Sequence, residues 1–87
     1  MMAVLIHDAA DKSLRSFEKK VRERIKQQIK LLAENPYSTQ LDIVKLKGIN
    51  DGPDLFRMRV GNYRVIYFIQ DGKILITDIG RRERIYG

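Results

Sequence analysis

The chain lacks cysteine entirely and has a single histidine among its 87 residues. Without cysteine it can form neither a disulfide framework nor a cysteine-based zinc site, and the redox compartment is left open. His7 has no second histidine with which to share a metal ion, and a lone histidine at the end of a short apolar run is more often structural than catalytic. We therefore expect no metal site, no cofactor and a structural role for His7.

Long apolar runs and common enzyme fingerprints are also missing. The start of the chain, MMAVLIHDAADK, has no basic region followed by a long apolar run, so it predicts a first strand and not a signal peptide. No segment is apolar enough to span a membrane, and a cytoplasmic protein is the default expectation. No P-loop, glycine-rich dinucleotide fingerprint, HExxH or serine nucleophile motif occurs, so the sequence does not indicate the enzymes that depend on them.

Positive charge is what the chain has in excess. The formal net charge is +6 and the sequence pI is about 9.8, which favours acidic partners such as nucleic acid, an anionic membrane surface or an acidic protein. No segment combines a basic face with exposed aromatic anchors, so a membrane is the least favoured of the three. The length and the 44% hydrophobic content suit one small core, and residues 1–87 are expected to form one domain.

One apolar stripe runs through the first half of the chain. Its members recur at spacings of three and four and are Ala10, Leu14, Phe17, Val21, Ile25, Ile29 and Leu32. This period predicts a single long helix capped by Asp8, or two helices if Ser16 caps the second one. Asn35-Pro36 ends the helical segment. Residues 41–48 allow either a loop or a short irregular strand.

Two turn signals divide the second half into three strands. Gly61-Asn62 and Asp71-Gly72 each separate two segments of alternating polarity, and both dipeptides tolerate the positive φ of primed hairpin turns. The predicted pairs are Val60 with Tyr63, Arg59 with Arg64, Met58 with Val65, Arg57 with Ile66, Ile69 with Ile74, Tyr67 with Ile76, Val65 with Asp78 and Arg64 with Ile79. The chain is thus expected to form an α+β fold, in which a three-stranded antiparallel meander packs its more apolar face on the helices.

The opposite face of this meander collects Arg57, Arg59 and Arg64. Direct opposition of Arg59 and Arg64 costs on the order of some tenths of a kcal/mol, so a polyanion that accepts forked hydrogen bonds is the favoured reason for it, with a solvated face as the alternative. Extending the third strand brings residues 80–82 beside the Gly61-Asn62 turn. The tail that follows either folds back and delivers Tyr86 to the same place or frays into solvent; the pattern leaves both open.

Arginines and tyrosines without a metal suit one kind of chemistry in particular. They can bind a phosphodiester and stabilise the charge that develops when it is attacked. RNA carries its own nucleophile in the 2′-hydroxyl, so positioning and electrostatics alone can support its cleavage.

Three segments in this order, KLKG at 45–48, LFRMRVGNYRVIY at 55–67 and GRRERIY at 80–86, resemble the RelE/ParE toxin superfamily, and most closely the RelE-like messenger-RNA interferases. The resemblance covers essentially the whole chain. It implies a type II toxin that cleaves mRNA in the ribosomal A site, and a cognate RelB-like antitoxin as partner beside the ribosome and mRNA. It also implies that the helical stretch is a two-helix hairpin broken near residues 17–19.

The resemblance also implies roles for individual residues. The catalytic positions are Arg57, Arg59, Arg64, Arg82 and Tyr86, and the positions expected to contact RNA are Lys45, Lys47, Arg81 and Arg84. Well-studied relatives carry lysine where this chain has Arg57 and Arg59. Arginine stays protonated and cannot act as a base. Either Tyr86 or a ribosomal group then accepts the 2′-hydroxyl proton, or the site works mainly through electrostatics.

Two other functions fit the same resemblance. One is a ParE-like inhibitor that binds DNA gyrase without cutting nucleic acid, and the other is an inactive module that binds RNA or antitoxin. The joint presence of Arg64, Arg82 and Tyr86 favours the nuclease over both.

Overall fold

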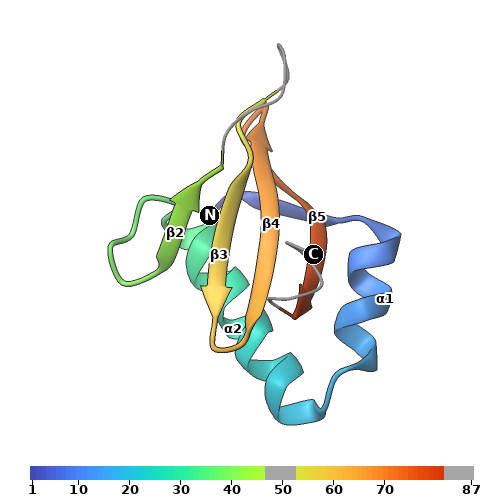
Figure 1. The fold of residues 1–87 in the computed structure, drawn as a ribbon. Coiled ribbons are helices and arrows are strands. Elements are labelled where there is room, and N and C mark those ends of the chain that lie inside the picture. Colours follow the sequence, from blue (N-terminus) through green and yellow to red (C-terminus); the bar gives the residue numbers. More distant parts are fainter. Residues whose placement is uncertain (47–52, 82–87) are drawn as a thin grey trace.

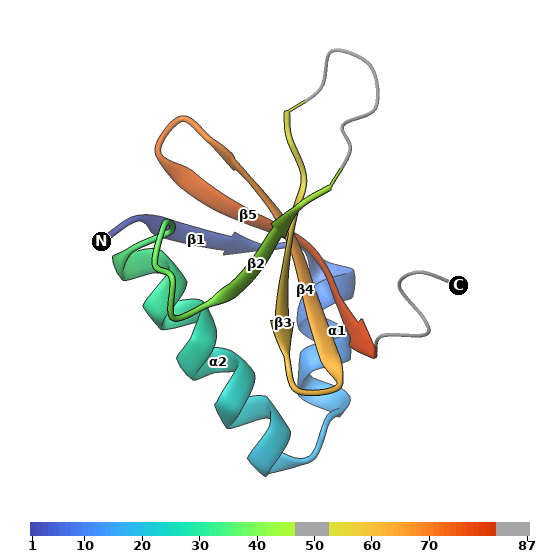
Figure 2. The same ribbon diagram turned by 60° about the vertical axis from the view of Figure 1, so that its left-hand side comes forward.

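The computed structural model describes residues 1–46 and 53–81. Strand β1 (Ala3–Ile6) is followed by helices α1 (Asp8–Ser16) and α2 (Lys19–Glu34), and then by β2 (Asp42–Lys45), β3 (Phe56–Val60), β4 (Tyr63–Gln70) and β5 (Lys73–Arg81). The α+β fold is therefore as predicted. Both helices pack on the same face of one sheet (Figures 1 and 2). We call the opposite face, which is turned away from the helices, the outer face.

The sheet has five strands in the order β1-β5-β4-β3-β2. The predicted meander forms its centre, because β3, β4 and β5 pair in antiparallel fashion. The sheet is wider than the meander at both edges. β1 lies parallel to β5, and residues 42–45 take the strand option that the sequence left open, as β2 antiparallel to β3. Among the described residues, no helix is long and apolar enough to cross a membrane.

The helical segment is broken, as the family resemblance implied. α1 ends at Ser16 and α2 begins at Lys19, although the apolar stripe continues through both. The predicted caps were wrong. His7, not Asp8, caps α1, because its Nδ1 accepts the backbone N–H of Ala9 at 3.2 Å. Ser16 caps nothing: its hydroxyl donates to the carbonyl oxygen of Ser13 at 2.6 Å. His7 thus has the structural role expected of it.

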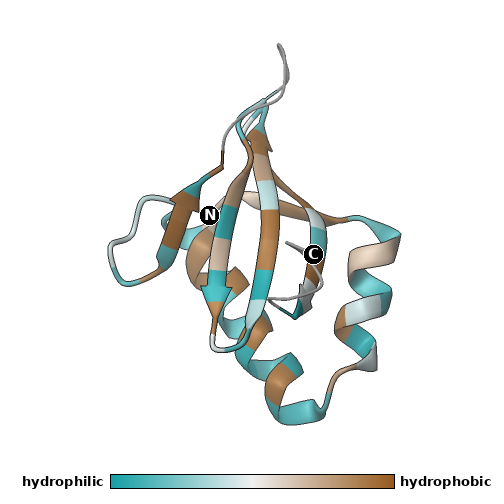
Figure 3. Ribbon diagram, viewed as in Figure 1, coloured by the Kyte–Doolittle hydropathy of each residue, from teal (hydrophilic) through white to brown (hydrophobic). Residues whose placement is uncertain are grey.

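The core lies between the apolar stripe of the helices and one face of the sheet. Figure 3 shows hydrophobic and hydrophilic residues alternating along β3, which is what a strand with one buried face requires. The buried residues that form the core are Ala10, Leu14, Ile25, Ile29, Leu32, Ala33, Leu41, Met58, Val60, Val65, Tyr67, Ile74, Ile76 and Ile79. Each large aliphatic member contributes about 1.5–3 kcal/mol of transfer free energy.

A bulge in β5 changes the register from the one predicted. The pairs Tyr67 with Ile76 and Ile69 with Ile74 are confirmed, but past Thr77 the pairing shifts by one residue, so that Val65 faces Ile79 and Arg64 faces Gly80. The Thr77 hydroxyl donates to the carbonyl oxygen of Ile66 at 3.3 Å. Strict alternation would have buried the Asp78 carboxylate, which is costly, whereas the bulge leaves Ile79 buried, only 1% exposed.

Deletion of Thr77 tests this role of the bulge. Without the extra residue, regular alternation keeps Ile79 opposite Val65 in the core and Asp78 opposite Ile66 on the outer face, and we expect a loss of less than about 3 kcal/mol in the free energy of unfolding. The matched change Thr77→Val removes only the hydroxyl and should cost about 1 kcal/mol or less. Denaturant unfolding measures both. A much larger loss on deletion, of about 4 kcal/mol or more, would contradict the view that the bulge serves only to absorb one extra residue while Ile79 stays in the core.

Tyr67 predicts a pH dependence of stability. Its side chain is 1% exposed and stacks on Phe56 with ring centroids 5.5 Å apart, and burial raises its pKa from the usual 10.0 to about 12. Because the folded pKa lies above the unfolded one, this stabilisation is fully present below pH 10 and is lost as the pH rises through 12. We expect about 1.4 kcal/mol to be lost by pH 11. Unfolding midpoints of the wild type and Tyr67→Phe between pH 9 and 11 measure it, and parallel profiles would contradict it.

Candidate functional site

Three arginines occupy the outer face near the β3–β4 turn. Arg57 and Arg59 alternate along β3, and Arg64 is the second residue of β4. Arg59 lies opposite Arg64 and Arg57 lies opposite Ile66, which is the predicted register. The hairpin therefore brings together the three strand arginines that the sequence singled out.

The three side chains differ in how far they are buried. Arg64 is 4% exposed and is the only buried charged side chain in the part of the chain that the structure describes. Arg57 is half-buried and Arg59 is exposed. Since a guanidinium keeps its proton in proteins, Arg64 is a permanent positive charge that the fold largely removes from solvent. The outer face thus offers one fixed cation and one that solvent and ligands reach freely.

The end of β5 reaches the same end of the sheet. Gly80 pairs with Arg64 and Arg81 pairs with Tyr63, so residues 80–81 lie beside the hairpin as predicted. Arg81 is not grouped with the three arginines, however. Its guanidinium carbon lies 5.8 Å from the centroid of the Tyr63 ring, which also packs against Phe17 with centroids 4.8 Å apart. Its pairing partner Tyr63 faces the helices, where it packs against Phe17, so Arg81 lies on that side while Gly80 lies beside Arg64.

Lys45 is not brought to the arginines. It pairs with Phe56 at the far end of β3, and its Nζ lies 3.2 Å from a carboxylate oxygen of Asp54. The other predicted site residues, Lys47, Arg82, Arg84 and Tyr86, lie outside the described residues.

Asp42 is a neighbour that the sequence analysis missed. It lies opposite Arg59 in the β2–β3 register and so adds an acidic group to the edge of the arginine cluster. Its position could not be predicted because the sequence pattern left residues 41–48 open between a loop and a strand, so no pairing with β3 was expected. This carboxylate limits the positive potential on the β2 side of Arg59.

The other end of the outer face is apolar. Leu5 pairs with Leu75, and Leu75 pairs with Phe68, so one row of large apolar side chains crosses three strands. Leu5 is 52% exposed, and Val44, which lies opposite Arg57 and so next to the arginines, is 42% exposed. Exposed apolar side chains on a sheet surface suit contact with another protein.

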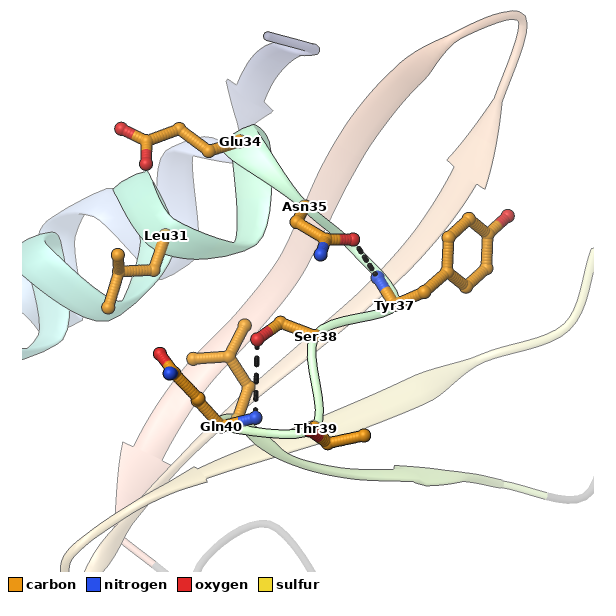
Figure 4. A pocket seen from close by; sticks show the side chains of 8 residues that line it. Leu31, Glu34, Asn35, Tyr37, Ser38, Thr39 and Gln40 are labelled. Atoms are coloured by element: carbon orange, nitrogen blue, oxygen red, sulfur yellow. Dashed lines mark hydrogen bonds between the residues drawn. The ribbon is translucent and has the colours of Figure 1, made fainter.

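A separate hollow of about 480 Å³ lies where α2 ends (Figure 4). Its polar groups are already used in holding the loop: Asn35 accepts the backbone N–H of Tyr37 at 3.1 Å, and the Ser38 hydroxyl oxygen accepts that of Gln40 at 3.2 Å. Its one charged lining residue is Glu34. It is therefore unsuited to a polyanion, and no group of three or more acidic or histidine side chains able to hold a metal occurs within 1–46 and 53–81.

The outer face can thus bind phosphate groups and neutralise charge on them. Arginine pairs with phosphate oxygens through two parallel hydrogen bonds, and a buried, fixed guanidinium does so without reorganisation when charge develops. Arg57, Arg59 and Arg64 supply no general base, because all three stay protonated.

Comparison with known proteins agrees with this arrangement. A family model described as the ParE toxin of a type II toxin–antitoxin system, parDE, matches residues 4–86. A RelE1 toxin candidate from Methanocaldococcus jannaschii is 34% identical over 86 residues, which cover 95% of this chain and 92% of the relative.

Two crystal structures of related complexes have the same fold. The matching chain of the archaeal RelE–RelB complex from Pyrococcus horikoshii OT3 is 35% identical, with a TM-score of 0.80 and coverage of 95% of this chain and 97% of that one. The RelB–RelE complex from Methanococcus jannaschii gives 31% identity, a TM-score of 0.73 and 94% coverage of both chains. The chain therefore belongs to the ParE toxin family of type II toxin–antitoxin systems, within the RelE/ParE superfamily.

Proposed function

We propose that this protein is a single-domain toxin that cleaves mRNA in the ribosomal A site as a metal-independent endoribonuclease. The observation that carries the proposal is the arginine cluster of the outer face, with Arg64 buried and Arg59 exposed beside it. An interface that only needed positive charge would not require a buried guanidinium. A reaction that develops charge on a phosphate gains most from a cation that is already in place.

In the proposed reaction, the 2′-hydroxyl oxygen of the RNA attacks the adjacent phosphorus. A bond to the 5′-oxygen of the next nucleotide breaks, which leaves a 2′,3′-cyclic phosphate and a free 5′-hydroxyl. Arg64 binds the scissile phosphate and stabilises the phosphorane, and Arg57 and Arg59 hold the flanking backbone. The 2′-hydroxyl proton passes to Tyr86 or to a ribosomal group, and Arg82 serves the leaving oxygen. Lys45, Lys47, Arg81 and Arg84 are proposed to contact RNA.

A RelB-like antitoxin is the proposed protein partner. The relatives from Pyrococcus horikoshii and Methanococcus jannaschii were crystallised with RelB. On this chain, the exposed Leu5 and Val44 and the exposed cation of Arg59 share the outer face, which suits a partner segment that is apolar on one side and acidic on the other.

Inhibition of DNA gyrase by binding is the second candidate. The matching family model bears the name of ParE, which favours this function independently of the arginine cluster. Such a protein would leave RNA intact and would reduce gyrase supercoiling.

The deciding experiment uses ribosomes stalled with a defined codon in an empty A site. We expect a cut within that codon and a 2′,3′-cyclic phosphate end, and Arg64→Gln should slow the reaction about 100-fold because one fixed charge stabiliser is lost. Arg59→Gln tests an exposed member of the cluster without disturbing the core, and Arg82→Ala and Tyr86→Phe test the tail. Lys30→Gln removes a charge from the exposed face of α2 and should leave the cleavage rate unchanged.

Free mRNA and a gyrase supercoiling assay complete the design. Chelation of metal ions is tested on free mRNA only, since removal of magnesium dismantles the ribosome. Intact mRNA after long incubation at high protein concentration would overturn the nuclease, and inhibited supercoiling in the same preparation would support the second candidate.

A further inference from the structure

Arg24 of α2 lies against the turn of the central hairpin. Gly61 has a φ of +61°, and a Cβ built on it would lie 3.2 Å from Nη1 and 3.7 Å from Cζ of Arg24. The guanidinium therefore rests on the bare Cα of Gly61. Glycine serves two purposes here, because it accepts the positive φ of the turn and leaves room for the arginine.

Arg59 reaches the same glycine from the outer face. Its Nε donates to the carbonyl oxygen of Gly61 at 3.5 Å, a long hydrogen bond that bends the side chain toward the turn. Two guanidiniums from different elements thus converge on one residue. The ion pairs found within 1–46 and 53–81, Arg15 with Asp11 and Lys45 with Asp54, involve neither of them. Asp42 lies opposite Arg59 in the sheet, so Arg24, which makes no ion pair within the described ranges, is the cation at this turn left to bind an external anion.

A cavity between α2 and the hairpin turn, which we call the recess, is where such an anion could bind. The cavity measures about 220 Å³, with Arg24, Asn62 and Tyr63 at its walls and Val21, Ile25 and Val60 among its apolar lining residues. Polar groups that converge on an apolar cavity fit a phosphate carrying a sugar or base. The other cations of α2 have no such setting, and Lys30 is exposed about 9 Å further along the helix.

We propose that this recess is a second phosphate-binding site, with Arg24 as its cation. A nucleic acid strand held at Arg64 and Arg59 on the outer face continues over the Gly61 turn, and a neighbouring backbone phosphate binds Arg24. The site rests on the proposed function for the class of its ligand, a ribonucleic acid backbone. That backbone belongs either to the mRNA substrate or to ribosomal RNA, and the experiment separates the two.

The test measures the salt dependence of binding for the wild type, Arg24→Gln and the matched control Lys30→Gln. The probe is a fluorescent single-stranded 2′-O-methyl RNA, which binds but cannot be cleaved. Loss of one phosphate contact lowers the slope of log K against log salt by about 0.7. We expect the slope to fall by this amount in Arg24→Gln, to stay unchanged in Lys30→Gln, and to return to the wild-type value in Arg24→Lys, which keeps the positive charge. Thermal melting checks that each variant is folded.

Cosedimentation with ribosomes forms the second arm. A weaker interaction of Arg24→Gln with the oligonucleotide assigns the phosphate to mRNA, and a loss seen only with ribosomes assigns it to ribosomal RNA. Equal behaviour of Arg24→Gln and Lys30→Gln in both arms would overturn the site, even if the wild type cleaves mRNA. A protein that binds through Arg24 and does not cleave would retain the site and overturn the nuclease.

Discussion

The antiparallel pairing of β3 with β4 is the constraint on which the rest of the molecule depends. Side chains alternate strictly along both strands, so one register sends Met58, Val60 and Val65 to the helices and Arg57, Arg59 and Arg64 to the outer face. A slip of one residue would exchange the two sets. The same turn that fixes this register, with Gly61 at φ +61°, also receives Arg24 from α2. The same strand register therefore sets both the packing of the core and the placement of the arginines.

Burial of Arg64 shows what this arrangement costs and what it supplies. A cation that is 4% exposed has lost most of its water, and a solvated charge at that position would be cheaper. In return, the sheet fixes the guanidinium, so a ligand phosphate need not order it. Arg59 keeps its water and remains adjustable. A phosphate chain that meets one fixed and one mobile arginine is positioned by the first and accommodated by the second.

Sequence pattern predicted the hairpin because its signals are local. Gly61-Asn62 and the alternation around it suffice for the register that places Arg59 opposite Arg64. The bulge at Thr77 escaped prediction, because the register was extended from the Asp71-Gly72 turn by strict alternation, which does not weigh the cost of burying Asp78. The prediction that the end of β5 lies beside the hairpin is confirmed for residues 80–81, with Arg81 over the Tyr63 ring.

The helices and the sheet edge show two further limits. The apolar stripe runs unbroken through Phe17, so periodicity does not demand a break, and it was the family resemblance that implied one near residues 17–19, where the structure has it at 17–18. β2 is four residues long and gains its strand form from pairing with β3, which no local signal predicts. Lys45 consequently lies away from the cluster and Asp42 beside it. The roles given to Arg82 and Tyr86 rest on resemblance alone.

With arginine at positions 57 and 59, the strands supply positive charge, and any proton acceptor has to come from elsewhere. Arginine does not act as a proton acceptor in proteins, so these strand positions can bind and neutralise phosphate but do not move a proton. In the proposed cleavage, any pH dependence would then arise outside β3 and β4, in the tail that follows Arg81 or in the ribosome. If the ribosome supplies the proton acceptor, free RNA would meet the charges of the strands without that acceptor, which would give the proposed dependence on the ribosome a chemical reason.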